Sequence, residues 1–228
     1  MSFPFTIIDL THSLSATTPS WDGSCGFEQS VALDYANCTT NTKFRVQHIT
    51  MHAGIGTHID APAHCFEGST TVDALALEHL IAPCAVIDIS DKADQIYSLS
   101  TDDIETFEKQ HGTIQPQSFV IIRTGWEQFW HEPERYRNNH QFPSVSLAAA
   151  HVLLKRDVVG LGIDTLGFDR PSDNYVVHAT VLGAGKYLVE NVANAHHLPR
   201  VGSYSIALPI KTVGGTEAPM RLIALIKK

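Results

Sequence analysis

The sequence predicts a single α/β domain that spans residues 1–228. Three observations lead to this fold class. Segments with the apolar patterns of β-strands are interspersed with segments that carry helix-capping signals. No internal repeat or low-complexity linker divides the chain. Of the 228 residues, 43% are hydrophobic, which is enough to bury a substantial core.

The strand-like segments occur from one end of the chain to the other. Residues 44–51 alternate apolar and polar side chains, and the glycines at 54 and 56 then break the regularity. Residues 158–164 are apolar up to a terminal aspartate, as expected of a buried strand. The other strand-like segments are residues 6–10, 82–89, 119–123, 204–210 and 220–226.

Two segments carry helix signals. Residues 100–112 begin with Ser100 and two aspartates, the pattern of a capped helix start, and end at a glycine. Residues 146–156 begin with Ser146 as the expected N-cap and place Lys155 and Arg156 in the last turn, where basic side chains favour the helix dipole. Strands and helices therefore mix along the chain.

The charge balance narrows the class of partner. The chain carries 24 acidic against 16 basic residues, a net charge of -8. No basic surplus exists to displace counterions from a phosphate backbone, so we expect no nucleic-acid partner. No apolar run approaches the roughly 18 residues of a membrane span, and we expect no membrane partner. Small molecules and cations are the expected partners.

The four cysteines indicate the redox state of the cellular compartment. Cys25, Cys38, Cys65 and Cys84 are widely spaced and form no CxxC pair, and the N-terminal residues lack the pattern of a secretion signal. We therefore expect free thiols in a reducing, cytoplasmic environment rather than disulfides.

The densest cluster of chemically active residues is His58-x-Asp60-x-x-x-His64. In an extended segment, residues two apart project to the same face, so His58 and Asp60 can hold one ion together. Imidazole and carboxylate ligands suit zinc, manganese or iron better than calcium. Pro62 turns the chain so that His64 faces the same pocket without joining the ligands. The alternative is a polar loop whose histidines only form hydrogen bonds within the loop.

A second pair lies far downstream. His178 and Glu190 are separated by a segment that contains Gly183-Ala184-Gly185. This spacing suits the ends of two elements joined by a turn at the glycines. By itself the pair is weak evidence for a site, because His and Glu at some spacing occur in almost every protein.

Residues 56–64, Gly-Thr-His-Ile-Asp-Ala-Pro-Ala-His, resemble the signature His-x-Gly-Thr-His-x-Asp-x-Pro-x-His of the cyclase-like metal hydrolases. That family includes kynurenine formamidase and isatin hydrolase. The resemblance extends over nearly the whole chain, because further segments resemble blocks of the family in the expected order. These segments are residues 9–14, 19–21, 123–126, 162–165 and 219–221.

The resemblance implies a set of metal ligands. His58 and Asp60 match the ligands within the signature, and His178 and Glu190 match the distal ligands at the family's own separation. Zinc or manganese is the implied cofactor, as one or two ions per chain, with Asp60 bridging where two ions are present.

The resemblance also implies the activity and the architecture. His64 matches the catalytic acid–base histidine, and Trp21 matches an aromatic residue that contacts substrate. The implied activity is kynurenine formamidase-like, namely cleavage of an amide, lactam or ester bond of a small, aromatic or cyclic substrate by metal-activated water. The implied fold has a β-rich, barrel-like centre with outer helices, of the swivelling β/β/α type. Family members commonly form homo-oligomers, so a dimer or tetramer is expected.

One position departs from the family signature. The first histidine of the signature falls on Gly54, which offers no ligand atom. His52 lies roughly 6–7 Å further back along the strand and could replace it only if the chain bulges. Otherwise the metal is held by fewer side chains. Cys65 could compensate as a thiolate, but we expect a small buried residue whose side chain points away from His64.

Two alternatives to hydrolysis stay open on the sequence. One is a metal-assisted cyclase or dehydratase, which would use the same metal and base. The other is a small-molecule-binding homologue without catalytic activity. Asp164, Thr165 and Asp169 follow a buried strand and either line the pocket or cap the next element. We favour capping.

Overall fold

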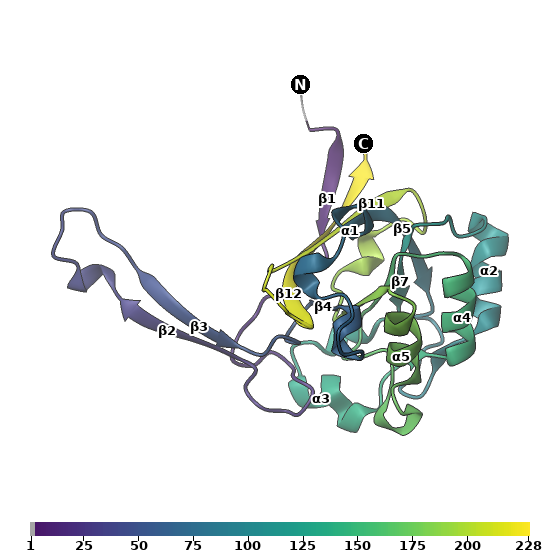
Figure 1. Ribbon diagram of the computed structural model, residues 1–228, viewed down its shortest axis with the longest axis horizontal. Helices are drawn as coiled ribbons and strands as arrows, with labels where there is room; N and C mark the ends of the chain where they lie inside the picture. The colour runs from purple at the N-terminus through teal and green to yellow at the C-terminus, as the bar shows by residue number, and fades with distance from the viewer. Residues whose placement is uncertain (1–2) are drawn as a thin grey trace.

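Seven strands form a closed barrel at the centre of the protein. The computed structural model describes residues 3–228 (Figure 1). Around the barrel the strands follow the order β12, β11, β5, β7, β9, β10 and β4, and β4 pairs with β12 to close the ring. Their bounds are β4 (His58–Asp60), β5 (Ile81–Asp88), β7 (Phe119–Arg123), β9 (Gly160–Ile163), β10 (Tyr187–Glu190), β11 (Ser203–Pro209) and β12 (Glu217–Lys227). The predicted α/β class with a barrel-like centre is confirmed.

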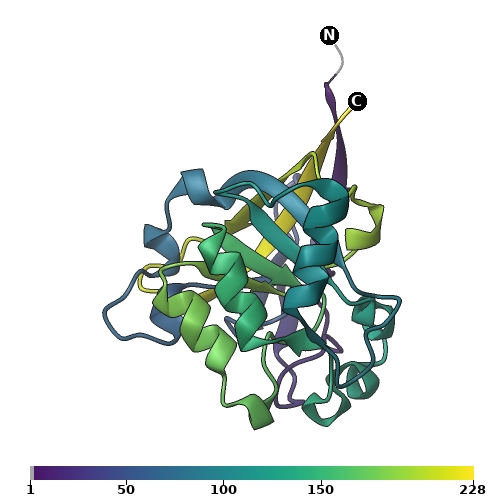
Figure 2. The same ribbon diagram turned by 90° about the vertical axis from the view of Figure 1, so that its right-hand side faces the viewer.

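Four neighbouring strands of the barrel, β5, β7, β9 and β10, are parallel. Parallel neighbours need crossover connections, and these contain the helices α2 (Thr101–His111), α4 (Leu147–Lys155) and α5 (Val176–Gly183). The three helices lie side by side over this part of the sheet (Figure 2). Because helices cover the outer face and the barrel interior covers the inner face, these strands are apolar on both sides, which explains their continuous hydrophobic runs.

The two predicted helices begin where their capping signals stand. Ser100 caps α2 together with Asp103, and Ser146 caps α4. Helix α5 was not predicted from the sequence. Its N-cap, Tyr175, has a left-handed backbone conformation and makes no side-chain cap, so the usual start signal is missing. The carboxylate of Asp169 accepts the first backbone N–H groups of this helix instead.

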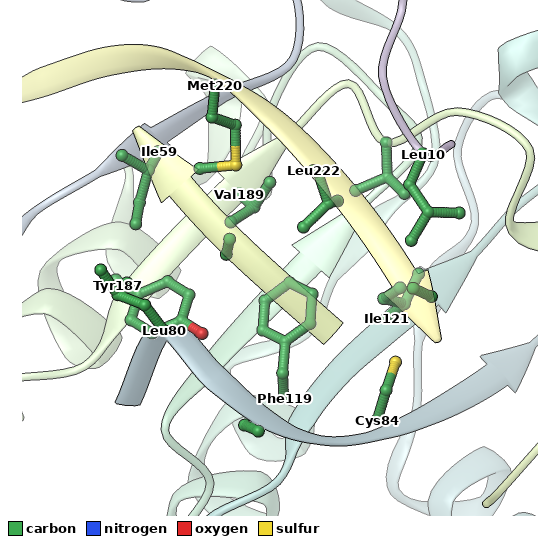
Figure 3. Packing of buried hydrophobic residues seen from close by; sticks show 14 of the residues in the cluster. Leu10, Ile59, Leu80, Cys84, Phe119, Ile121, Tyr187, Val189, Met220 and Leu222 are labelled. Atoms are coloured by element: carbon green, nitrogen blue, oxygen red, sulfur yellow. The ribbon is translucent and has the colours of Figure 1, made fainter. Parts of the chain in front are cut away.

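The barrel interior is filled by apolar side chains from six of its seven strands, all except β9 (Figure 3). Within it the rings of Phe119 and Tyr187 stack with their centroids 5.7 Å apart. Gly160 makes this possible, because a Cβ at that position would lie 2.5 Å from the Tyr187 ring. A second apolar layer lies between the outer face of the parallel strands and the three helices.

The alternation of side chains along β4 and β10 determines where the polar residues lie. Ile59 in β4 and Val189 in β10 belong to the interior cluster. Successive residues of a strand point to opposite faces, so His58, Asp60 and Glu190 project from the outer face of the barrel. Helix α5 packs against β10 and covers this part of the face.

The remaining strands and helices are short or peripheral. Strand β1 (Phe5–Asp9) pairs with β12, and β2 (Phe27–Leu33) and β3 (Val46–Met51) form a hairpin that stands away from the barrel (Figure 1). We refer to this hairpin, residues 27–51, as the arm. The short elements are β6 (Ser98–Leu99), β8 (Ser144–Val145), α1 (Leu77–Leu80) and α3 (Pro133–Arg137). The predicted strand over residues 44–51 corresponds to β3.

Candidate active site

Strand β4 lies between β10 and β12, and both neighbours place a carboxylate beside it. Glu190 of β10 pairs with His58, and Glu217 of β12 pairs with Asp60. Directly paired residues on antiparallel strands project to the same face. One imidazole and three carboxylates therefore converge on the outer face of the barrel.

Helix α5 adds a second imidazole to this group. The Nε2 atom of His178 lies 3.1 Å from Oε1 of Glu190 and 3.7 Å from Oδ2 of Asp60. The Nε2 atom of His58 lies 3.5 Å from both Oδ1 of Asp60 and Oε2 of Glu190. All four side chains are buried. The structure thus brings together the four residues that the family resemblance implies as metal ligands.

Both imidazoles are oriented by a hydrogen bond from Nδ1, the ring nitrogen that does not face the carboxylates of the implied ligands. His58 Nδ1 donates to the carbonyl oxygen of Gly56 over 2.9 Å, and His178 Nδ1 donates to Oδ2 of Asp169 over 2.7 Å. In each case the donated proton sits on Nδ1 and leaves Nε2 as the atom that can bind a metal.

The close approach of these groups changes their proton affinities. Burial alone would lower the pKa of His58, but the carboxylates of Asp60 and Glu190 outweigh burial and raise it to about 9. The pKa of His178 is raised well above its ordinary value for the same reason, with Asp169 the largest of the raising contacts. Burial and the charge of Asp60 raise the pKa of Glu190. The group therefore binds protons that a divalent cation would displace.

The donor set fits a divalent cation. Asp60 is only 2% exposed, and its Oδ1 atom has no hydrogen-bond partner within residues 3–228. A buried carboxylate oxygen without a partner is costly unless a charge balances it. Two sets of donor atoms lie within 4.8 Å of one another: Asp60 with His178 and Glu190, and His58 with Asp60 and Glu217. Nitrogen and carboxylate ligands of this kind suit zinc or manganese.

A cavity of about 460 Å³ opens onto these residues. His64 lies on its wall in the 3₁₀ turn η2 (Pro62–His64), with Nδ1 3.5 Å from Oε2 of Glu217. This contact raises the pKa of His64. Trp21, at 36% exposure, also lines the cavity. The other residues that line the cavity are Gly54, His58, Asp60, Cys65, Leu166, Tyr175, His178, Glu190, Asn191 and Glu217.

A buried hydrogen-bond network holds the Gly-Thr-His segment of the signature. The Thr57 hydroxyl donates to the carbonyl oxygen of Asn191 over 2.6 Å, and the Asn191 amide donates to the carbonyl oxygen of Gly56 over 2.8 Å. Tyr136 donates to the Asn191 side chain from the other side. Gly56 itself has φ = +63°, a conformation that favours glycine. These contacts hold His58 in place.

The position of the Cys65 side chain differs from the one expected from the sequence. Its side chain is exposed and lines the cavity rather than being buried. The expectation assumed that residues 64 and 65 alternate as in a strand, whereas both lie in or beside the turn η2, where successive side chains do not alternate. Partial desolvation raises the pKa of the Cys65 thiol, which disfavours the thiolate and makes Cys65 a poor nucleophile at neutral pH.

The other residues left open by the sequence also have defined places. His52 is exposed at the base of the arm, where its backbone N–H donates to Gly26. Asp169 caps α5, which confirms the capping interpretation for that residue. Asp164 is different, because its carboxylate accepts N–H and O–H groups of the loop that follows β7.

Glu217 was not identified from the sequence. It stands in a loop-to-strand segment with no motif of its own, two residues before the block at residues 219–221. Only its register opposite Asp60 reveals its place in the site. Its closeness along the chain to that family block is the one signal that could have drawn attention to it.

Comparison with known proteins identifies the family. A family model named Cyclase, with the description "Putative cyclase", matches residues 8–170. The chain belongs to this cyclase family. Isatin hydrolase of Roseibium aggregatum is 31% identical over 76% of this chain and 72% of its own length. Kynurenine formamidase of Bacillus cytotoxicus is 26% identical over 95% of both chains.

Solved structures agree with this membership of the cyclase family. An isatin hydrolase bound to the product analogue thioisatinate has a TM-score of 0.90 at 26% identity, covering 99% of this chain and 94% of that one. A protein described as a potential metal-dependent hydrolase with cyclase activity has a TM-score of 0.77 at 26% identity, covering 98% of this chain and 99% of that one. The two named relatives, isatin hydrolase and kynurenine formamidase, are hydrolases of C–N bonds, which favours hydrolysis over the ring-forming and binding-only alternatives. Among the described residues, no helix is both long and apolar enough to span a bilayer.

Proposed function

We propose that this protein is a metal-dependent hydrolase that cleaves an amide, lactam or ester bond of a small aromatic or cyclic substrate. The convergence of His58, Asp60, His178 and Glu190 beside His64, at the wall of one cavity, carries the proposal. The names of the relatives, isatin hydrolase and kynurenine formamidase, support a C–N bond as the target.

The proposed ligands would hold one or two ions of zinc or manganese. A divalent cation at this position supplies Lewis-acid polarisation of the substrate carbonyl and lowers the pKa of a water molecule toward neutrality. The chain prepares the site for this, because Nδ1 of each imidazole is occupied by an acceptor and Nε2 faces the carboxylates.

We propose His64 as the acid–base residue. Its Nδ1 atom faces Glu217, which leaves Nε2 for proton exchange in the cavity. His64 would accept a proton from the attacking water and return it to the leaving nitrogen or oxygen, while the Glu217 carboxylate stabilises the protonated imidazole. The imidazole is one-third exposed, so a substrate can reach it.

We propose Trp21 as a substrate contact. Together with Leu166 and Tyr175 it gives the cavity apolar surface beside the polar residues. The ring of Trp21 lies 6.1 Å from that of Tyr175 and 4.2 Å from that of His140, measured between centroids. A flat substrate would bury its face against this surface and present its carbonyl to the metal ligands.

A panel of substrates tests the proposed activity. Metal-loaded protein is assayed with an aryl formamide, isatin and an aryl ester, before and after chelation. We expect chelator-sensitive hydrolysis of at least one of these, and a loss of about 10²- to 10⁴-fold in kcat for His64→Ala at unchanged metal content. Normal turnover by His64→Ala would refute the role of His64. The absence of chelator-sensitive turnover on the whole panel would refute the hydrolase proposal.

We also propose that the protein is a homo-oligomer that associates through the arm. Paired positions place Val31, Ile49 and Met51 on one face of this two-stranded ribbon, and all three are exposed. An isolated hairpin is marginally stable in water, so this face needs a covering surface. A second copy fits, because residues 27–51 carry two acids and two bases and avoid the repulsion that the net charge of -8 would otherwise cause.

Light scattering coupled to size exclusion tests the association. We expect wild-type protein to be a dimer or tetramer, and Ile49→Lys to shift it toward monomer. Thr50→Lys, on the opposite face of the same ribbon, is the matched control and should leave the mass unchanged. A monomeric wild type would contradict the proposal.

A cytoplasmic location is proposed on the cysteines. All four are thiols in the structure, and Cys25 and Cys65 are exposed, a state that suits a reducing compartment. Fractionation of cells that express the protein would test this.

A further inference from the structure

The site contains a substitution that the family signature does not predict. The first histidine of the signature is replaced by Gly54, and a carboxylate occupies the space that a side chain would need. A Cβ on Gly54 would collide with Oε1 of Glu217 and lie 3.3 Å from Nε2 of His58. Glu217 therefore occupies the space in which the side chain of a ligand residue at position 54 would start, next to His58.

Glu217 comes from a part of the chain that is far from position 54 along the sequence. It stands at the start of β12, directly paired with Asp60 of β4. Glu190 of β10 is paired in the same way with His58, on the other side of β4. The closed barrel therefore gives β4 one carboxylate from each neighbouring strand, Glu190 in register with His58 and Glu217 in register with Asp60.

These positions produce two sets of three ligands that share one residue. Asp60, His178 and Glu190 form the first set, and His58, Asp60 and Glu217 form the second, each with donor atoms within 4.8 Å of one another. Asp60 belongs to both sets. Its buried Oδ1 has no hydrogen-bond partner within the described residues, so this oxygen is available to a cation.

We propose that Glu217 is a metal ligand that replaces the missing histidine at position 54, so that the protein keeps a second cation site with His58 and Asp60. This inference rests on the proposed metal-dependent function. The two oxygens of Glu217 then act separately, because Oε1 lies beside His58 and Gly54 whereas Oε2 faces His64. The side chain is 25% exposed, which leaves it free to adjust to an ion.

The replacement changes the character of the second site. With Glu217 in place of a histidine, the site has one nitrogen and two carboxylate ligands. Oxygen-rich sites suit manganese, whereas added imidazole ligands favour zinc. The two ions would also balance the three carboxylates, Asp60, Glu190 and Glu217, that lie together in a low-dielectric region.

Metal stoichiometry tests the inference without relying on activity. Protein stripped with chelator is reloaded with Mn²⁺, and manganese per chain is measured by elemental analysis. We expect about two ions per chain for wild type and about one for Glu217→Ala, and electron paramagnetic resonance should change from an exchange-coupled to a mononuclear spectrum. Glu67→Ala, an exposed glutamate outside the cavity, is the matched control and should match wild type.

The double variant Gly54→His with Glu217→Ala provides a gain-of-binding test. It removes the carboxylate that blocks position 54 and supplies the family's own ligand there. We expect the second ion to return. If Glu217→Ala does not fold, Glu217→Gln keeps the side-chain size, and we expect at least a tenfold weaker second binding step.

The outcomes separate this inference from the proposed function. One ion per chain in both wild type and Glu217→Ala, or two in both, would overturn the role of Glu217 and leave the hydrolase proposal standing. No bound metal in wild type, after reloading with Mn²⁺ and separately with Zn²⁺, would overturn both.

Discussion

The carboxylate of Asp169 connects the metal site to the start of helix α5, and its removal should weaken both. It accepts three hydrogen bonds: from the backbone N–H of Val177 and of His178, each over 2.9 Å, and from Nδ1 of His178 over 2.7 Å. The residue is 1% exposed, so water cannot replace a lost partner. The change Asp169→Asn keeps the shape and removes the charge.

The expected magnitude follows from these contacts. An asparagine has one acceptor oxygen, so at least one N–H faces an amide NH₂ and loses its partner. Loss of a helix N-cap costs about 1 kcal/mol, and a hydrogen bond to a charged group contributes about 1.5–3 kcal/mol. We therefore expect a loss of about 1–3 kcal/mol in the free energy of unfolding of the metal-free protein. Weaker orientation and basicity of His178 should reduce metal affinity by about 10- to 100-fold.

Two measurements check this expectation. Urea denaturation gives the free energy of unfolding, and competition with a chelator gives the metal affinity. Asp173→Asn is the control, because Asp173 also accepts a backbone N–H, at Arg170, but caps the neighbouring 3₁₀ turn and makes no hydrogen bond to His178. If Asp169→Asn binds metal as tightly as wild type, Asp169 does not tune His178 and the argument from its contacts is refuted.

Three further changes separate stability from chemistry. Ile59→Ala should cost about 2–5 kcal/mol of unfolding free energy, because this side chain is completely buried in the barrel, and it should leave metal content unchanged; a cost below about 1 kcal/mol would contradict the packing. Burial alone would raise the pKa of Asp88, but hydrogen bonds from Ser90 and Arg123 lower it to about 2. Asp88 therefore adds stability above about pH 4 that is lost as pH falls toward 2. After allowance for solvent screening, Asp88→Asn should lower the free energy of unfolding by about 1–2 kcal/mol at pH 7 and by little at pH 2. Cys65→Ser should keep metal content and turnover within about threefold, because the raised pKa disfavours the thiolate; a hundredfold loss would restore Cys65 as a nucleophile or ligand.

Much of the fold was accessible from local patterns. The strands at residues 119–123 and 81–88 and the helices capped by Ser100 and Ser146 were predicted to within about two residues, because apolar runs and capping side chains act over a few positions. Helix α5 was missed because its capping carboxylate, Asp169, lies outside the usual N-cap position. The exposure of β3 was also not predictable, since its pattern is that of any strand.

By itself the sequence determined that His58 and Asp60 share one face, because a strand repeats every two residues, and that position 54 lacks a ligand. It also indicated the family, through a signature of nine residues. The family resemblance implied His178 and Glu190 as distal ligands, but only the tertiary structure decided how these distant groups meet the signature and that Glu217 joins them. Closure of the barrel pairs β12 and β10 with β4 and so brings Glu217 and Glu190 beside the signature, while α5 supplies His178. Such pairing depends on the register of strands that are remote along the chain, and no local pattern encodes that register.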